Sequence, residues 1–410
     1  MQQRYIRQLF KDTDYVRTGG SPEELKCAEY LLEQCRLMGV EGHIETFPVQ
    51  MAAMKEAHLY ADGKEIPCKG YLNCGSGQIE APLVYLPSTD PASLTGIRGK
   101  IVLLDTGVGY FGLRDLLENG AVGFITYNGN VNFRDKDIDD KELRSYVSCG
   151  EKLLGVNIHV TDAISLVKNK VKTVRLVIDE EEYEGESRNA VAELPGETDE
   201  WIVLTAHYDS VPQSRGAYDN MSGSVGLLGI LEALKDKKHR YGVRFVFCGS
   251  EERGLLGSKA YVAAHEDELK KIALNINLDM IGTIMGKFIA CVSAEDKLMH
   301  FITYFAQMRG WGISARQGVY SSDSTPFADK GIPAVSFARI APSNTATIHN
   351  SYDTMALMKG EQMAEDIDFL VAFTERMANA RFCPVAREMP DNMKEKLDIY
   401  LCRKRGDHKK

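Results

Sequence analysis

The sequence lacks any apolar run long enough to cross a membrane. The longest candidate, residues 225–234, is short and contains Glu232, whereas a membrane helix needs roughly 18 or more apolar residues. Residues 1–10 alternate charged and apolar side chains, and no apolar segment precedes a small-residue cleavage site as in a secretory signal. We therefore expect a soluble chain that is neither exported nor bound to membranes.

The sequence also lacks the cysteine patterns of disulfide scaffolds and zinc ribbons. Its 9 cysteines are an odd number and include no Cys-x-x-Cys pair. Cys27, Cys35, Cys248 and Cys291 lie within apolar patterns, as expected for buried free thiols. Free thiols persist in a reducing compartment, so the sequence predicts a cytoplasmic protein.

Basic charge is scarce as well. The formal net charge is −9, and the only basic cluster, which includes Arg403, Lys404 and Arg405, lies in the last residues. We interpret that cluster as a solvated tail, because a nucleic-acid-binding domain normally carries a basic patch or stripe. Nucleic acids are therefore excluded as partners.

The chain is long enough for more than one core, because 410 residues exceed what a single core usually serves. Strand-like and helix-like apolar runs alternate from about residue 189 to 381, whereas residues 58–180 read as short strands broken by turn residues. We predict an α/β fold with a mainly parallel mixed sheet flanked by helices, interrupted by a β-rich insert. The predicted parts are residues 1–57 and 181–385 (the catalytic domain), 58–180 (the insert) and 386–410 (a C-terminal tail).

Side chains that can bind metal follow the strand-like runs directly. His207 follows residues 201–206, Glu251 and Glu252 come just after 243–248, and Asp279 follows 272–278. In an open α/β sheet the binding crevice lies beyond the carboxyl ends of the strands, so these groups should converge there. Two further candidates, Asp219 and His349, occupy loops that can reach the same edge.

This set offers more ligands than one ion requires. A single catalytic zinc needs three protein ligands and a water, whereas two imidazoles and three carboxylates suit two ions that share a carboxylate. A two-ion centre can hold a bridging hydroxide and polarise a carbonyl, as amide hydrolysis requires. Nitrogen and oxygen ligands without thiolate favour zinc, with manganese or cobalt as substitutes.

Two acids beside these ligands complete the predicted chemistry. One of the adjacent Glu251 and Glu252 can bind metal while the other transfers the proton of the attacking water, although spacing alone leaves their roles open. Asp209, two residues after His207, is placed to accept the second N–H of that imidazole.

Several segments resemble, in order, the aminopeptidase Y and glutamate carboxypeptidase family of co-catalytic zinc peptidases. They are Ala-His-Tyr-Asp at 206–209, Tyr-Asp-Asn-Met-Ser-Gly at 218–223, the stretch 247–258 around Glu-Glu, Asn-Leu-Asp at 277–279, Ser-Asp-Ser-Thr-Pro-Phe at 322–327 with Gly-Ile-Pro at 331–333, and Ile-His at 348–349. The resemblance implies a zinc-exopeptidase fold of the phosphorylase/hydrolase-like type and an aminopeptidase acting on peptides.

The same resemblance assigns roles to individual residues. It implies that His207 and Asp279 bind one zinc ion, that Glu252 and His349 bind the other, and that Asp219 bridges them. Glu251 would be the general base, and the peptide bond between Asp219 and Asn220 would be cis. Asp323 and Arg339 are weaker candidates for substrate binding, since a turn aspartate and a solvated arginine are equally good interpretations.

Residues 99–128 and 155–159 are similar to the protease-associated domain that some family members insert. Such an insert could restrict access to the site or serve only as a structural element. The glycine pattern at 107–112 superficially fits a dinucleotide-binding turn, but the following strand ends in Asn128 and Asn130 where an acidic residue would be needed. We therefore reject nucleotide binding.

Three other functions are compatible with the same fold. A carboxypeptidase for acidic C-terminal residues would need a basic pocket, for which Arg215, Arg253 and Arg339 are the possible donors. A glutaminyl cyclase would use one zinc ion and would not need His207. A receptor-like binding protein without activity would have no reason to keep Glu251.

Overall fold

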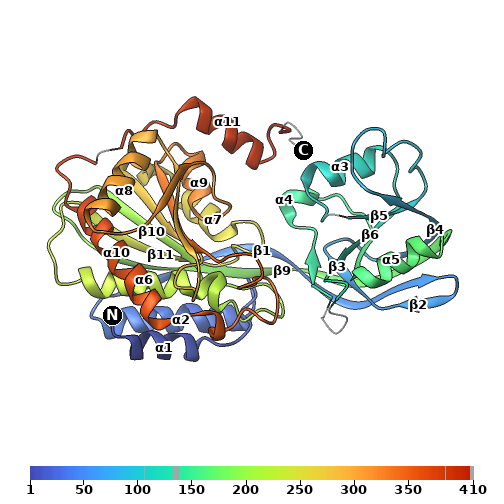
Figure 1. Ribbon diagram of the computed structural model, residues 1–410, viewed down its shortest axis with the longest axis horizontal. Coiled ribbons are helices and arrows are strands. Elements are labelled where there is room, and N and C mark those ends of the chain that lie inside the picture. Colours follow the sequence, from blue (N-terminus) through green and yellow to red (C-terminus); the bar gives the residue numbers. More distant parts are fainter. Residues whose placement is uncertain (106, 133–137, 384, 407–410) are drawn as a thin grey trace. The chain divides into compact units, whose positions relative to one another are not determined.

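The computed structural model describes residues 1–105, 107–132, 138–383 and 385–406. Contacts within the chain divide it into two units, one formed by residues 1–49 and 186–410 and the other by residues 50–185 (Figure 1). The chain passes between the units within β1 (Gly42–Ala61) and β9 (Thr173–Leu194). The charged segment 179–187 is therefore part of a long strand.

The first unit is built on a mixed sheet in the order β14-β13-β15-β12-β10-β11-β9. Its four central strands run parallel, whereas β13 is antiparallel to β15 and the end of β9 is antiparallel to β11. The prediction of a mainly parallel mixed sheet is confirmed. The strands not yet delimited are β10 (Trp201–His207), β11 (Gly242–Cys248), β12 (Ile272–Leu278), β13 (Lys287–Ser293), β14 (Ser314–Gln317) and β15 (Ala334–Ile340).

Helices cover both faces of this sheet, which explains why its central strands are apolar at nearly every position. Leu204 of β10 points into the larger core cluster, whereas its neighbour Val203 points into the smaller cluster on the opposite face. The larger cluster takes side chains from α1 (Gln3–Asp12), α2 (Pro22–Leu37), α6 (Ser222–Leu234), α8 (Asp296–Met308) and α10 (Gly360–Ala378), and the smaller one from α7 (Leu256–Ala264) and α9 (Ser324–Asp329).

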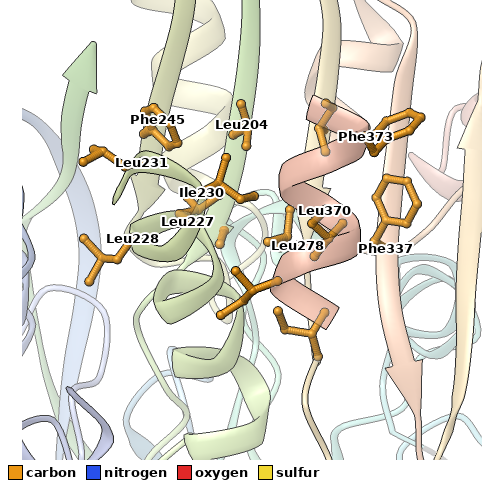
Figure 2. Close-up of a cluster of buried hydrophobic side chains, with 14 of the residues drawn as sticks. Leu204, Leu227, Leu228, Ile230, Leu231, Phe245, Leu278, Phe337, Leu370 and Phe373 are labelled. Atoms are coloured by element: carbon orange, nitrogen blue, oxygen red, sulfur yellow. The ribbon is translucent and has the colours of Figure 1, made fainter. Parts of the chain in front are cut away.

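The centre of the larger core lies between α6, α10 and the sheet (Figure 2). Leu227 and Leu231 of α6 and Leu370 and Phe373 of α10 are fully buried there. Burial of each such side chain stabilises the fold by about 1.5–3 kcal/mol. Because α6 begins next to the loop that carries Asp219, this packing also holds one of the predicted metal ligands in place.

The start of α2 agrees with its sequence signals in part. Ser21 accepts the backbone N–H of Glu24 and Pro22 occupies the first turn, a combination typical of a helix start. The side chain of Glu24, however, is fully buried and accepts hydrogen bonds from the hydroxyls of Ser187 and Ser250. The sequence pattern identified the cap but not this long-range contact.

The segment predicted as a C-terminal tail contains a helix, α11 (Asp391–Tyr400). Met393 and Leu397, four residues apart, are buried against a small cluster that includes Ala328 of α9. Arg403, from the expected solvated cluster, pairs with Asp329 while its side chain stays 53% exposed. The cluster is thus at the surface, but the segment before it is packed.

The second unit combines a sheet with short helices. Its strands β4, β5, β6 and β8 are parallel neighbours, and β3 is antiparallel to β8. Its assignment as a protease-associated domain stays a prediction. The elements of this unit are β2 (Lys64–Ile66), β3 (Cys68–Leu72), β4 (Gly77–Leu86), β5 (Ile101–Leu104), α3 (Tyr110–Glu118), β6 (Gly123–Asn128), β7 (Lys141–Glu142), α4 (Ser145–Ser148), β8 (Gly155–His159) and α5 (Val160–Lys168).

Among the described residues, no helix combines the length and apolar character that crossing a membrane requires.

Candidate metal centre

The parallel strands of the first unit bring the predicted ligands to one edge of the sheet. His207 is the last residue of β10, Glu252 follows the end of β11, and Asp279 follows β12 directly. Asp219 lies in η1 (Ala217–Met221), just before α6, and His349 lies in the loop after β15. Neighbouring parallel strands therefore place these side chains together, as their positions in the sequence predicted.

Asp219 lies between the two histidines. Its Oδ1 is 3.2 Å from Nε2 of His207, and its Oδ2 is 3.0 Å from Nε2 of His349. Each carboxylate oxygen therefore faces a different imidazole nitrogen. This is the arrangement expected of a carboxylate that bridges two metal ions.

The other acids divide between the same two sides. His207, Glu251 and Asp279 form one group whose possible ligand atoms all lie within 4.8 Å of one another, and Asp219, Glu252 and His349 form another. Asp279 Oδ1 is 3.8 Å from His207 Nε2, and Glu252 Oε2 is 3.2 Å from His349 Nε2. Nitrogen and oxygen ligands without sulfur fit zinc.

Several donor atoms in this cluster are buried without a hydrogen-bond partner in the described part of the chain. They include Nε2 of His207, Oε1 of Glu252 and Oδ1 of Asp279. Buried polar atoms normally have hydrogen-bond partners, so a group of unpartnered nitrogen and oxygen atoms at one place needs an explanation. Metal ions at the two groups would supply the missing partners, and the residues present therefore fit zinc.

The two sides differ in exposure. His207 is fully buried, whereas the side chain of His349 is 46% exposed and its backbone lies in the left-handed region at φ 61°. A non-glycine residue in that conformation is uncommon and is often found at functional sites. The His349 side is therefore the open side of the site.

The backbone next to Asp219 is held by buried polar side chains. The peptide bond between Asp219 and Asn220 is cis. The amide of Asn220 donates to the carbonyl of Leu278 at 2.9 Å, and its Oδ1 accepts the N–H of Met280 at 3.0 Å. These bonds join the segment that carries Asp219 to the end of β12, which carries Asp279.

Asp209 supports the loop after β11. Its two carboxylate oxygens accept the backbone N–H groups of Glu251 and Glu252 at 3.0 and 3.2 Å. Its Oδ1 also lies 3.4 Å from Nδ1 of His207, but that nitrogen has no hydrogen-bond partner among the described residues. Asp209 is thus placed beside the imidazole as predicted, while its hydrogen bonds go to the two glutamates.

Burial and neighbouring charges shift the pKa values of these groups. Burial raises the pKa of Glu251 well above its usual range, although the charge of His207 opposes the shift. Burial would lower the pKa of His349, but Asp219 and Glu252 raise it to about 11. Without metal the site therefore retains protons, and they must leave when a metal binds the neutral imidazoles.

Asp219 shows the opposite shift. Burial would raise its pKa, but the imidazoles of His207 and His349 on its two sides lower it below its ordinary value. The carboxylate is therefore ionised, as a metal ligand must be.

The two weaker candidates both have largely buried side chains. Asp323 is fully buried, both its carboxylate oxygens lack a hydrogen-bond partner among the described residues, and burial raises its pKa to about 7. Arg339 forms an ion pair with the buried Asp366 and donates to the carbonyl of Gly286 at 2.9 Å. These contacts account for Arg339 structurally, and a substrate role for either residue stays a prediction.

Two residues near the site had no sequence signal. Asp353 is fully buried and accepts the N–H groups of Tyr218 and Asp219, and Arg17 is fully buried beside the loop that precedes Asp219. An aspartate in a loop and an arginine between two helices look like surface residues in the sequence. Only the fold brings them to the metal ligands.

The comparisons with known proteins agree with this geometry. Residues 189–373 match the family model described as peptidase family M28. This segment belongs to peptidase family M28. The M28 segment contains every predicted metal ligand and Glu251, so the family resemblance read from the motifs is confirmed.

Relatives of the M28 segment carry the names of aminopeptidases. The chain is 30% identical over 281 residues to leucine aminopeptidase 2 of Trichophyton equinum, covering 62% of this chain and 52% of that protein. It is 35% identical over 181 residues to aminopeptidase YwaD of Bacillus subtilis, covering 42% of this chain and 40% of that protein. The chain thus spans about half the length of the first of these relatives.

Solved structures share the fold over nearly the whole chain. An aminopeptidase from Aneurinibacillus sp. strain AM-1 superposes with a TM-score of 0.78 at 24% identity, covering 94% of this chain and 96% of that one. BSAP, a zinc aminopeptidase from Bacillus subtilis, gives a TM-score of 0.76 at 24% identity, covering 93% and 96%. The chain therefore shares the fold of these structures over the M28 segment and over most of the residues outside it.

Proposed function

We propose that the protein is a zinc-dependent aminopeptidase that hydrolyses the first peptide bond of peptides. The observation that carries the proposal is the position of Asp219, whose two carboxylate oxygens face His207 and His349 separately. A carboxylate shared in this way supports a site for two ions rather than one.

The ligands divide between two zinc ions in this proposal. His207 and Asp279 would hold one ion, Glu252 and His349 the other, and Asp219 both. When bound, zinc lowers the pKa of water and polarises a carbonyl oxygen. The deep burial of His207, Asp219 and Asp279 keeps bulk water away from the ligands.

Glu251 is the proposed general base. Its carboxylate lies with His207 and Asp279 at one side of the cluster, and burial raises its pKa well above the usual range. A carboxylate with a raised pKa is a better proton acceptor near neutral pH. Glu251 would take a proton from the attacking water and return it to the amine that leaves when the C–N bond breaks.

The arginines argue against a pocket for a C-terminal carboxylate. Of the three that we considered, Arg339 is paired with Asp366 and Arg215 with Asp14. The third, Arg253, is 6% exposed. The names of the relatives, leucine aminopeptidase 2 and aminopeptidase YwaD, also support action at the N-terminus.

A panel of matched peptides tests the proposal. Peptides with a free N-terminus and the same peptides with an N-acetyl group would be incubated with zinc-loaded protein, with chelator-treated protein and with treated protein after zinc is restored. We expect release of the first residue from free peptides only, lost with chelator and regained with zinc. Cleavage of acetylated peptides would contradict the aminopeptidase assignment, and chelator-resistant activity would contradict the metal mechanism. Manganese and cobalt would be added in parallel to identify substitutes.

The proposal includes a cytoplasmic location, supported by the absence of disulfides among the 9 cysteines. A relative in Mycobacterium tuberculosis carries the name probable lipoprotein aminopeptidase LpqL. Cell fractionation with an antibody against this chain distinguishes the two locations. Recovery in the membrane or culture fraction would contradict the proposal.

A further inference from the structure

The loop between His207 and Asp219 has little regular structure of its own. Residues 208–216 form neither helix nor strand, yet they connect two predicted ligands that must be held in fixed positions. Buried backbone carbonyls in such a loop need hydrogen-bond donors from elsewhere. In this structure a single side chain, that of Arg17, donates to the carbonyls of Tyr208, Arg215 and Gly216.

The guanidinium of Arg17 binds the loop at both ends. Its Nε donates to the carbonyl of Tyr208, its Nη1 to the carbonyl of Arg215, and its Nη2 to the carbonyl of Gly216 at 2.7 Å. The backbone of Arg17 also binds Ser210. The N–H of Arg17 donates to the hydroxyl of Ser210, and the N–H of Ser210 donates to the carbonyl of Arg17. Residue 17 therefore holds the loop from just after His207 to just before η1.

Arg17 is itself fixed by its own segment. Its Nη1 also donates to the carbonyls of Thr13 and Tyr15, at 3.2 and 3.1 Å. The side chain is fully buried, and among the described residues it forms no ion pair with a carboxylate. A buried charge without a paired carboxylate is costly, so its retention calls for a role beyond packing.

Gly216 shows how tightly this contact is made. Its φ of 52° lies in the left-handed region, and a Cβ there would come within 2.5 Å of the carbonyl oxygen of Asp219 and 3.0 Å of Nη2 of Arg17. Only glycine allows the backbone to approach so closely. The conformation of Gly216 therefore allows the loop backbone to contact the guanidinium of Arg17.

Asp353 holds the other side of the same loop. Its Oδ1 accepts the N–H of Tyr218 at 2.7 Å and its Oδ2 accepts the N–H of Asp219 at 3.0 Å. The side chain is fully buried, which raises its pKa to about 7, although the two N–H groups and the charge of Arg17 oppose this shift. The backbone carbonyls just before η1 thus accept from the guanidinium of Arg17, and the backbone N–H groups within η1 donate to the carboxylate of Asp353.

We propose that Arg17 and Asp353 are positioning residues that orient Asp219 so that its two oxygens face the two metal positions. Neither touches substrate or metal; both act through the backbone of residues 208–219. The proposal rests on the metal centre described under the proposed function. It adds that the affinity of that centre for zinc depends on a cation from the N-terminal segment and an anion from the loop after His349.

Zinc binding to the full chain tests this directly. The zinc-free protein would be titrated against a chromophoric chelator to give the stoichiometry and dissociation constants of wild type, Arg17→Met and Asp353→Asn. Loss of a residue that orients a ligand typically weakens metal binding about 10- to 100-fold. We expect a loss of this size for at least one of the two ions in both variants, with circular dichroism unchanged.

Arg244→Met is the matched control. Arg244 is also a buried arginine, 6% exposed, but it pairs with Glu193 near the start of β11, at the opposite end of the strand from Glu252. The Arg244→Met variant should have a lower melting temperature than wild type but the same affinity for zinc. If Arg17→Met does not fold, Arg17→Lys replaces it, since lysine keeps the charge but has fewer and less well placed donors.

The outcomes are distinguishable. Zinc affinities equal to wild type in the folded Arg17 variant and in Asp353→Asn would overturn the positioning role. Equal losses in Arg244→Met would do the same, because they would show a general effect of stability. A wild-type chain that binds no zinc would instead contradict the proposed function, and this inference with it.

Discussion

His349 Nε2 lies 3.0 Å from Oδ2 of Asp219, and the two side chains differ sharply in burial. The imidazole is 46% exposed, whereas the carboxylate side chain is 7% exposed. In the proposed centre one ion is thus held partly by a solvent-accessible ligand and the other by the buried His207. The two ions should therefore differ in how easily they are lost.

The first prediction concerns that difference. His349→Ala should lower the affinity for one zinc ion by at least about 10-fold. The affinity for the other ion should stay near that of wild type, because His207 and Asp279 are unchanged. Stepwise removal with a chelator, followed by metal analysis, measures both. His300→Ala, at an exposed histidine, is the control. Equal loss of both ions would contradict the assignment of ligands to sides.

The second prediction separates Glu251 from Glu252. Glu251→Gln should keep both zinc ions while kcat falls about 10²- to 10⁴-fold, the usual effect of removing a general base. Glu252→Gln should lose one ion, since its carboxylate lies 3.2 Å from His349. Metal content and kcat measured on the same preparations decide between them. If Glu251→Gln loses an ion and Glu252→Gln does not, the two roles must be exchanged.

The third prediction concerns Asp209. Its two oxygens accept the N–H groups of Glu251 and Glu252, and an asparagine has only one oxygen to offer. Asp209→Asn should therefore leave a buried N–H unpaired, destabilise the fold by about 1–3 kcal/mol and lower kcat/KM. Urea unfolding and peptide hydrolysis measure the two effects. Asp199→Asn, at a 79% exposed side chain, should change neither.

The fourth prediction is a pH dependence of stability. Burial raises the pKa of Glu24 from its ordinary 4.5 to about 8, although the hydroxyl of Ser187 and the charge of Arg188 oppose the shift. Between these values the folded state holds a proton that the unfolded state releases. The free energy of unfolding should therefore fall as pH rises from 4.5 to 8, by up to about 1.4 kcal/mol per pH unit.

Glu24→Gln should remove this contribution. Urea unfolding at several pH values would give a shallower decline for the variant than for wild type. Glu23→Gln, at an exposed position on the same helix, should keep the wild-type slope. Identical slopes in both variants would show that Glu24 does not titrate in this range.

Much of the fold was predictable because the strands are buried on both faces. Residues 201–206 and 243–248 are apolar at every position except Thr205 and Arg244, which is typical of parallel strands covered by helices. The apolar stripe of α10, which includes Met363, Ile367 and Leu370, is likewise visible in the sequence. In contrast, α11 was missed because its apolar side is narrow, with Met393 and Leu397 as its buried residues.

The sequence by itself determined which residues could bind metal and that they would meet. His207, Glu252 and Asp279 each follow a strand, and the carboxyl ends of neighbouring parallel strands lie at one edge of a sheet. That inference needs only periodicity and order along the chain.

Only the tertiary structure decided how Asp219 is oriented and what holds it. Arg17 and Asp353 are far from Asp219 in the sequence, and each acts through backbone groups that every residue carries. A hydrogen bond to a backbone carbonyl or N–H leaves no residue-type signature at the partner position. Such contacts exist only once distant segments have packed together, which is why no pattern in the sequence could predict them.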